Sequence, residues 1–307
     1  MFDIQPTPIL KLDNDLFKLK KIDVWIKLDF LNHEFVSGNK LRKLKYNIEW
    51  FYQHKFQSIT SFGGPYSNHL SALSFLGKSL NIPTIGYIRG DYHLKKSDTI
   101  MFCEDNGMEI NYLPIYEYHK KEDLEFLKLL ENNHKNSLIL PEGGKGELAK
   151  KGCSEIVDEV ENQLDTKPNY YISAFGTGTT ICGIAEKLDD NQLAFGISAI
   201  KGINFEQNIK SAQNFTKKNL LIFDQYHFGG FAKSNNNLIE FVQFFVNQYS
   251  IPIDPLYNAK SLFALFDLAK NNFFPEQSKI VVIHTGGLQG ITGFCKRYNL
   301  DTKLFGI

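Results

Sequence analysis

Short apolar runs alternate with helical patterns along most of the chain. Val24–Leu28 has the length of a strand, and residues 40–53 follow it as a predicted helix. That helix has apolar side chains on one face, namely Leu41, Leu44, Ile48 and Phe51. Further strand-length segments are 58–62, 83–88, 109–113, 137–140, 170–175, 193–200 and 280–284, and further helical patterns are 97–106, 121–130, 238–248 and 261–271. This alternation predicts an α/β protein with open, twisted, mostly parallel sheets flanked by helices.

Four turns that follow predicted strands are rich in small and polar residues. They are Ser37–Lys40, Gly63–His69, Gly176–Thr180 and Thr285–Gly287. The carboxyl ends of parallel strands meet at one edge of a sheet, and ligands of α/β proteins bind at that edge. We therefore expect these turns to supply the functional residues.

Composition excludes several classes of protein. The 34 basic residues balance the 34 acidic ones, which argues against a nucleic-acid or anionic-membrane partner. The four cysteines are far apart and form no C-x-x-C pair, so we expect reduced, buried thiols and no metal site. The first residues show no secretory signal and no segment could span a bilayer, which predicts a cytoplasmic protein.

The turn made of Gly176, Thr177, Gly178, Thr179 and Thr180 is a candidate phosphate site. A glycine-threonine loop before a helix offers free backbone N–H groups, hydroxyls and the positive end of the helix dipole. No lysine follows as in a P-loop, and Ile181 occupies the place of the third glycine of a dinucleotide fingerprint. A bare phosphate therefore fits better than a nucleotide, although a tight turn without a ligand is the alternative.

Lys40 is the second candidate for chemistry. It opens a helix, where the dipole disfavours a cation, and it lies close in sequence to Arg42 and Lys43. Desolvation and neighbouring cations would lower its pKa and favour the free amine that attacks an aldehyde. We expect Lys43 and Lys45 themselves on a solvated face. A reactive lysine and a phosphate site are the minimum that pyridoxal phosphate requires.

Six motifs in order resemble one enzyme family. Ser37–Leu44, Ser-Gly-Asn-Lys-Leu-Arg-Lys-Leu, resembles the Gly-Gly-Asn-Lys-x-Arg-Lys-Leu segment of the 1-aminocyclopropane-1-carboxylate (ACC) deaminase/D-cysteine desulfhydrase family. Ser61–His69 resembles that family's Gly-Gly-x-x-Ser-Asn-His/Gln segment. The remaining motifs are Pro141–Gly144, Gly176–Thr180, Asp254–Tyr257 and His284–Gly287, and the likeness extends from about Pro8 to Gly290.

The resemblance implies a pyridoxal phosphate enzyme with the fold of the tryptophan synthase β-subunit, called fold type II. It implies two sheets, one in a larger cofactor-binding domain of residues 1–42 and 150–307 and one in a smaller inserted domain of residues 43–149. It also implies a small amino-acid substrate and a homodimer.

The resemblance further assigns roles to single residues. Lys40 would hold the cofactor covalently and move protons, and Ser67 and Tyr257 would act on the substrate beside it. The other cofactor-binding residues would be Asn39, Asn68, Gly176, Thr177, Gly178, Thr179, Thr180 and Thr285, and the substrate-binding residues Ser67, Asn68, His69, Tyr257 and Asn258.

Two positions bear on the substrate. ACC deaminases resemble Tyr-Glu and Leu-Gly-Gly where desulfhydrase-like members have Tyr-Thr and Thr-Gly-Gly, and this chain has Tyr257-Asn258 and Thr285-Gly286-Gly287. A carboxylate near the pyridine nitrogen would help keep that nitrogen protonated, and the neutral Asn258 would do so less well, which suits β-elimination from D-cysteine. ACC deamination and non-catalytic cofactor binding remain alternatives. His227–Ala232 is either an active-site loop or a solvent-facing turn.

Overall fold

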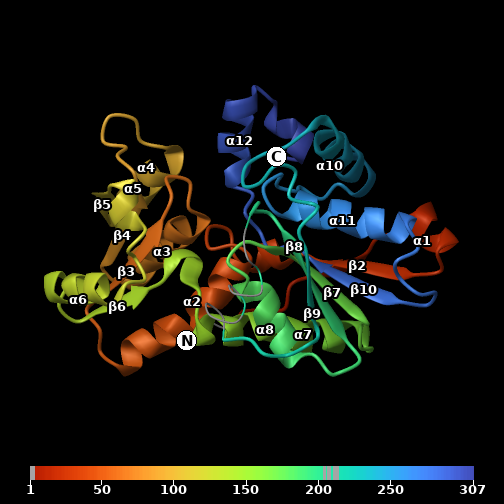
Figure 1. Ribbon diagram of the computed structural model, residues 1–307, viewed down its shortest axis with the longest axis horizontal. Helices are drawn as coiled ribbons and strands as arrows, with labels where there is room; N and C mark the ends of the chain where they lie inside the picture. The colour runs from red at the N-terminus through yellow and green to blue at the C-terminus, as the bar shows by residue number, and fades with distance from the viewer. Residues whose placement is uncertain (1–3, 203–204, 206–208, 210–213) are drawn as a thin grey trace.

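The computed structural model describes residues 4–202, 205, 209 and 214–307 and contains two sheets (Figure 1). The larger has the strand order β1-β2-β10-β7-β8-β9 and the smaller β5-β4-β3-β6. All neighbouring strands are parallel except β1 and β2. The strands are β1 Ile9–Lys11, β2 Asp23–Lys27, β3 Ser58–Gly63, β4 Thr84–Arg89, β5 Glu109–Leu113, β6 Ser137–Leu140, β7 Tyr170–Phe175, β8 Leu193–Ser198, β9 Leu220–Phe223 and β10 Lys279–Ile283. The predicted fold class is confirmed.

Helices cover both faces of the larger sheet. Because side chains alternate along a strand, Ile280 and Val282 of β10 join a core with α1, α10, α11 and α12, whereas Val281 and Ile283 join a core with α7 and α8. The helices are α1 Asp15–Leu19, α2 Asn39–Gln53, α3 Asn68–Leu80, α4 Asp98–Asp105, α5 Ile115–Tyr118, α6 Leu124–Asn133, α7 Glu147–Leu164, α8 Thr179–Lys187, α10 Asn236–Tyr249, α11 Asn258–Lys270 and α12 Gly290–Tyr298. The described residues contain no helix with the length and apolar character that crossing a membrane requires.

Helix α2 connects the two sheets. Its predicted apolar stripe is buried in the core of the smaller sheet. Another side of α2 packs on α7, where a Cβ added to Gly152 would lie 2.0 Å from the main-chain oxygen of Arg42. Only glycine permits this approach of the two backbones. The domain boundaries predicted at residues 42/43 and 149/150 fall inside α2 and α7.

Several elements differ from the sequence-based expectation. The strands β5, β6 and β7 have the predicted bounds, but the helical pattern at 121–130 forms α6 only from Leu124 to Asn133. Strands β1 and β9 were not predicted: β1 has only 3 residues, too few for a periodic signal, and β9 is a partly exposed strand at the edge of the larger sheet. Helix α7 was not predicted either, because charged residues separate its buried Ala149, Cys153 and Ile156.

Candidate active site

The turn before Lys40 is fastened to the turn after β10. Gly38 has a φ of +67°, and a Cβ added there would lie 2.0 Å from the main-chain oxygen of Thr285. The N–H of Asn39 donates to that same oxygen over 3.1 Å. Glycine is therefore required at position 38 both by conformation and by space. The contact holds the start of α2 against the end of the larger sheet.

Lys40 is linked to the Gly176–Thr180 loop through Asn39. The Nζ of Lys40 donates to Oδ1 of Asn39 over 2.6 Å, and Nδ2 of Asn39 donates to Oγ1 of Thr180 over 2.9 Å. Burial, and to a smaller extent the charge of Lys43, lowers the pKa of Lys40 to about 7. About half of the side chain is therefore the free amine at neutral pH, as a nucleophilic lysine requires.

Lys43 is buried, and the expectation of a solvated position was wrong. Its Nζ donates to the main-chain oxygen of Gly143 over 3.1 Å and to Oγ1 of Thr177 over 3.3 Å. Among the described residues, no carboxylate oxygen lies within 4.0 Å of this nitrogen. Lys27, Lys45 and Lys150, in contrast, each form an ion pair with a glutamate. Residues three apart share a helix face, so Lys43 follows Lys40 toward the loop. Lys45 instead forms a partly exposed ion pair with Glu155.

The loop before α8 has the donors that a phosphate needs. Thr179 and Thr180 are buried in the first turn of the helix, where backbone N–H groups lack intrahelical partners. Thr177 lies within 3.1 Å of Thr179, oxygen to oxygen. The buried amino group of Lys43, the hydroxyls and the helix N-terminus together fit a doubly charged phosphate, and Lys40 fits an aldehyde. These residues therefore fit pyridoxal phosphate.

The Ser67-Asn68-His69 segment begins α3. Oγ of Ser67 accepts a hydrogen bond from the N–H of Leu70 over 3.2 Å, which caps the helix. Asn68 faces the last turn, because a Cβ added to Gly287 would lie 3.3 Å from its Nδ2. Ser67 and Asn68 are both partly exposed. This places the three-residue segment and the turn after β10 at one location.

His69 is buried and its protonation state follows from its neighbours. Ser61 donates its only hydroxyl hydrogen to the main-chain oxygen of Leu140 over 2.9 Å, so it accepts from Nε2 of His69 over 2.9 Å. The Nδ1 of His69 has no hydrogen-bond partner. Burial, followed by the charges of Lys43 and Lys40, lowers the pKa of His69 to about 3. The imidazole is therefore neutral, with its free lone pair on Nδ1.

Asp254 organises the segment that contains Tyr257, a role that was not predicted from the sequence. Its Oδ1 accepts from the N–H groups of Leu256 and Tyr257 over 3.0 and 2.7 Å, and its Oδ2 accepts from the N–H of Asn258 over 3.1 Å. The ring of Tyr257 lies beside the Gly176–Thr180 loop, since a Cβ on Gly176 would be 3.2 Å from its Cε1. Burial raises the pKa of Tyr257, so its hydroxyl is protonated at neutral pH.

The side-chain amide of Asn258 is fully used by the protein. Its Nδ2 donates to Oδ2 of Asp254 and, over 2.6 Å, to the main-chain oxygen of Gly286. Its Oδ1 accepts from the main-chain N–H of Thr285 over 2.9 Å and from the Thr285 hydroxyl over 3.3 Å. Two donors and two acceptor positions are the capacity of an amide. Asn258 therefore fixes the Thr285–Gly287 turn, and direct contact with a substrate would require it to release a partner.

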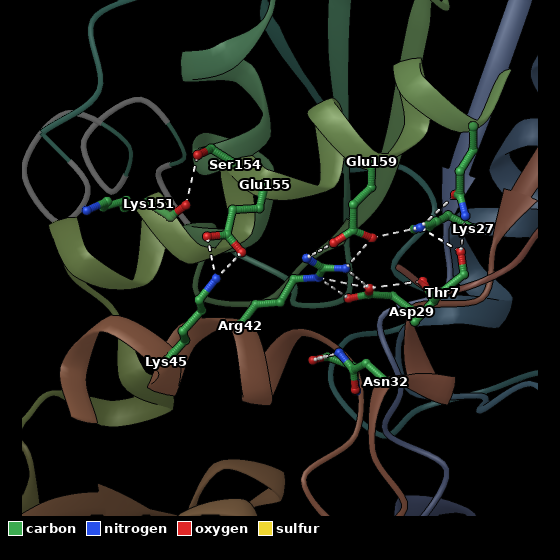
Figure 2. A network of polar contacts seen from close by, with 12 residues as sticks. Thr7, Lys27, Asp29, Asn32, Arg42, Lys45, Lys151, Ser154, Glu155 and Glu159 are labelled. Atoms are coloured by element: carbon green, nitrogen blue, oxygen red, sulfur yellow. Dashed lines mark hydrogen bonds and ion pairs between the residues drawn. The ribbon is translucent and has the colours of Figure 1, made fainter. Parts of the chain in front are cut away.

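A buried ionic network connects the start of α2 to β2 and α7 (Figure 2). Arg42 donates to both oxygens of Asp29 over 2.6 to 2.9 Å and to Glu159 of α7 over 2.8 and 2.9 Å. Lys27 of β2 pairs with the same Glu159 over 2.8 Å and donates to the main-chain oxygen of Thr7 over 2.7 Å. The network joins β2, α2 and α7. From the sequence, Arg42 was expected only as a cation close to Lys40.

Comparisons with known proteins agree with this arrangement. A model of the family described as pyridoxal-phosphate dependent enzyme matches residues 1–286. A Pyrococcus furiosus protein provisionally named 1-aminocyclopropane-1-carboxylate deaminase is 28% identical over 92% of this chain and 90% of its own length. The bifunctional D-cysteine desulfhydrase/1-aminocyclopropane-1-carboxylate deaminase of Arabidopsis thaliana is 25% identical over 88% of this chain and 73% of its own.

A solved structure described as an ACC deaminase homologue has the same fold. It superposes with a TM-score of 0.79 at 24% identity and covers 96% of this chain and 94% of its own. The resemblance found in the six motifs is thus confirmed by relatives along nearly the whole chain. The chain belongs to the family of pyridoxal phosphate-dependent enzymes, with ACC deaminases and D-cysteine desulfhydrases among its relatives.

Proposed function

We propose that this pyridoxal phosphate-dependent enzyme catalyses β-elimination on a small D-amino acid such as D-cysteine. With one water, D-cysteine yields pyruvate, hydrogen sulfide and ammonia. The observation that supports this choice is the neutral Asn258, which uses its whole amide to hold Asp254 and the Thr285–Gly287 turn.

The division of labour at the site follows from the contacts described above. When bound, pyridoxal phosphate supplies the electron sink for charge that develops at the substrate's α-carbon. The Gly176–Thr180 loop and Lys43 hold the phosphate, and Asn68 binds the ring hydroxyl. Lys40, whose pKa is lowered to about 7, anchors the cofactor and exchanges the α-proton.

Ser67, His69 and Tyr257 act on the substrate itself. Ser67, at the N-terminus of α3, binds the carboxylate with help from the helix dipole. Because His69 is neutral, it can accept a hydrogen bond from the substrate and does not compete with Ser67 for the negatively charged carboxylate. Tyr257 remains protonated at neutral pH, which suits a donor of a proton to the departing group.

The leaving group is the physical reason for preferring D-cysteine over ACC. A thiolate departs readily, whereas opening an unactivated cyclopropane ring demands more electron withdrawal. A carboxylate near the pyridine nitrogen would deepen the electron sink, and the amide of Asn258 lacks the charge to do so. ACC deamination to 2-oxobutanoate and ammonia is the second candidate, and the names of most of the relatives favour it.

Product analysis tests the choice. The purified, cofactor-loaded protein is incubated in parallel with D-cysteine, L-cysteine and ACC, and sulfide, pyruvate and 2-oxobutanoate are measured. Sulfide and pyruvate from D-cysteine alone are expected. 2-Oxobutanoate from ACC with no sulfide from D-cysteine would overturn the proposal in favour of the second candidate.

Two controls accompany this experiment. Lys40→Ala should remove the visible absorption of lysine-bound cofactor, and absorption that survives dialysis in this variant would contradict the assigned lysine. We also propose a homodimer, on the basis of the family resemblance. Light scattering of the loaded protein should give twice the 35.2 kDa of one chain, and a monomer would contradict this.

A further inference from the structure

The segment from Tyr226 to Ala232 has an unusual backbone. Four of its residues have positive φ angles: 50° at Phe228, 93° at Gly229, 116° at Gly230 and 54° at Ala232. Two of these are not glycine, and one of the two is bulky. Such conformations persist only where the surroundings hold them.

The surroundings that hold this segment centre on Lys260 of α11. Its Nζ donates to the main-chain oxygens of Gly230 and His227 over 2.8 and 2.9 Å and reaches that of Ala199 at 3.4 Å. The side chain is completely buried. Within the described residues, no carboxylate forms an ion pair with it at 4.0 Å or less, in contrast to the buried Lys27 of β2 and Lys150 of α7.

Lys260 is charged at neutral pH despite this burial. Burial lowers its pKa to about 8, which leaves most of the side chain protonated at pH 7. A buried cation therefore lies among three carbonyl oxygens. Carbonyl oxygens are also the ligands with which proteins bind hard cations.

The segment reaches the candidate active site through Phe231. The ring centroids of Phe231 and Tyr257 are 5.7 Å apart, and Phe231 is 47% exposed. His227 is turned into the segment itself, where its Nδ1 accepts from the N–H of Gly229 over 2.8 Å. The sequence left two interpretations of His227–Ala232, an active-site loop and a turn. His227 fits the turn, because its side chain binds within the segment. Phe231, not His227, makes the contact with the candidate active site.

Lys260 and Tyr257 are also joined along the chain. They are three residues apart, one helical turn, at the start of α11. The lysine thus connects the backbone that follows Tyr257 to the segment that packs against the Tyr257 ring. On the far side, the hydroxyl of Tyr298 donates to the main-chain oxygen of Ala232 over 3.0 Å.

We propose that Lys260 is a positioning residue whose ammonium serves as a built-in cation, holding residues 227–230 so that Phe231 packs against Tyr257. The catalytic consequence rests on the proposed function, in which Tyr257 touches the substrate. The structural consequence stands independently of it.

The test removes the ammonium group of Lys260 and supplies a free cation in its place. In the cofactor-loaded Lys260→Ala variant, the amides of residues 228–233 should exchange with solvent about tenfold faster or more, because a charged hydrogen-bond donor has been removed. Methylammonium or potassium should restore protection in a saturable manner. Tetramethylammonium at equal ionic strength should not, since it has no N–H and is too large for the space.

Kinetics supply the second readout. Because Tyr257 is the proposed proton donor, kcat for the substrate of the wild-type enzyme should fall more than KM rises, and methylammonium should reverse both changes together with the exchange. Lys270→Ala, on the exposed last turn of the same helix, is the matched control and should change neither readout. If the protein has no turnover with D-cysteine, the exchange experiment still decides the role of Lys260.

Three outcomes would overturn the proposal. They are wild-type protection of residues 228–233 in Lys260→Ala, restoration by tetramethylammonium as strong as by methylammonium, and an equal effect of Lys270→Ala. Should Lys260→Ala fail to fold, Lys260→Met keeps the apolar stem without the charge. Loss of protection confined to the segment would then support the proposal, and unchanged protection would refute it.

Discussion

The guanidinium of Arg42 and the carboxylate of Asp29 are bound through three hydrogen bonds of 2.6 to 2.9 Å, and both side chains are completely buried. Replacing Arg42 by Met would leave the Asp29 charge without its main partner in the interior. We expect a loss of about 3–5 kcal/mol in the free energy of unfolding, measured by chemical denaturation.

Lys45 offers a control on the same helix. Its ion pair with Glu155 is partly exposed, so Lys45→Met should cost only about 0–1 kcal/mol. Equal losses in the two variants would show that the buried network contributes nothing special to stability.

The lowered pKa of Lys40 predicts how the apoprotein takes up its cofactor. Only the neutral amine attacks an aldehyde, so the rate of attachment should rise with pH and reach half its maximum near pH 7, not near 10.5. Absorbance after mixing with pyridoxal phosphate, confirmed by borohydride trapping, measures this rate. In Lys43→Gln the midpoint should move to higher pH, because a positive charge that favours the free amine is gone. An unchanged midpoint in that variant would contradict the electrostatic explanation.

His69 should remain uncharged throughout the working range of the enzyme. Since its pKa is lowered to about 3, its ring nitrogens should not titrate between about pH 5 and 8 in a ¹⁵N NMR experiment. The spectrum should show hydrogen on Nε2 and none on Nδ1, as the hydrogen bond to Ser61 requires. His69→Gln, which keeps a neutral polar group, should retain more activity than His69→Leu. A titrating ring or the opposite tautomer would exclude this assignment.

The amide of Asn258 can be tested by the isosteric Asn258→Asp. The new carboxylate would face Asp254 and could no longer donate to Gly286. One of the two acids should then keep its proton, with a pKa above its value in the unfolded chain. The stability of the variant should therefore be highest in acid and fall as pH rises through that raised pKa. Thermal denaturation from about pH 4 to 8 measures the slope.

The double variant Asp254→Asn/Asn258→Asp restores one acid and one amide at the pair. It should recover part of the lost stability at neutral pH. No recovery would mean that the backbone N–H groups around position 254, and not the side-chain pair, determine the effect.

The sequence predicts which turns form the site better than it predicts which side chains hold those turns in place. Glycine-rich turns after strands are local signals, and they correctly bring Lys40, Asn39 and the Gly176–Thr180 loop together. Lys43 and Lys260 escape such an analysis because a lysine is counted as a surface residue until its distant partners are known. Those partners are carbonyl oxygens of Gly143 and Gly230, 100 and 30 positions away in sequence.

Asp254 illustrates the same limit at short range. Its motif is visible in the sequence, but its four N–H partners depend on the turn that the whole sheet imposes. Asn258 was interpreted as a group near the cofactor ring, and its contacts with Gly286 and Thr285 appear only once the end of β10 is placed beside it.

The position of β2 has a consequence for the order of assembly during synthesis. The smaller sheet draws all its strands from residues 58–140, whereas β2, at residues 23–27, finds its parallel partner only at residues 279–283. The strands of the smaller sheet can therefore pair while the chain is still on the ribosome. Strand β2 cannot pair with β10 until residues 279–283 have been made. The contact of Asn39 with Thr285 forms later still. Lys40 is thus made early and reaches its working surroundings only after Thr285 has been added to the chain.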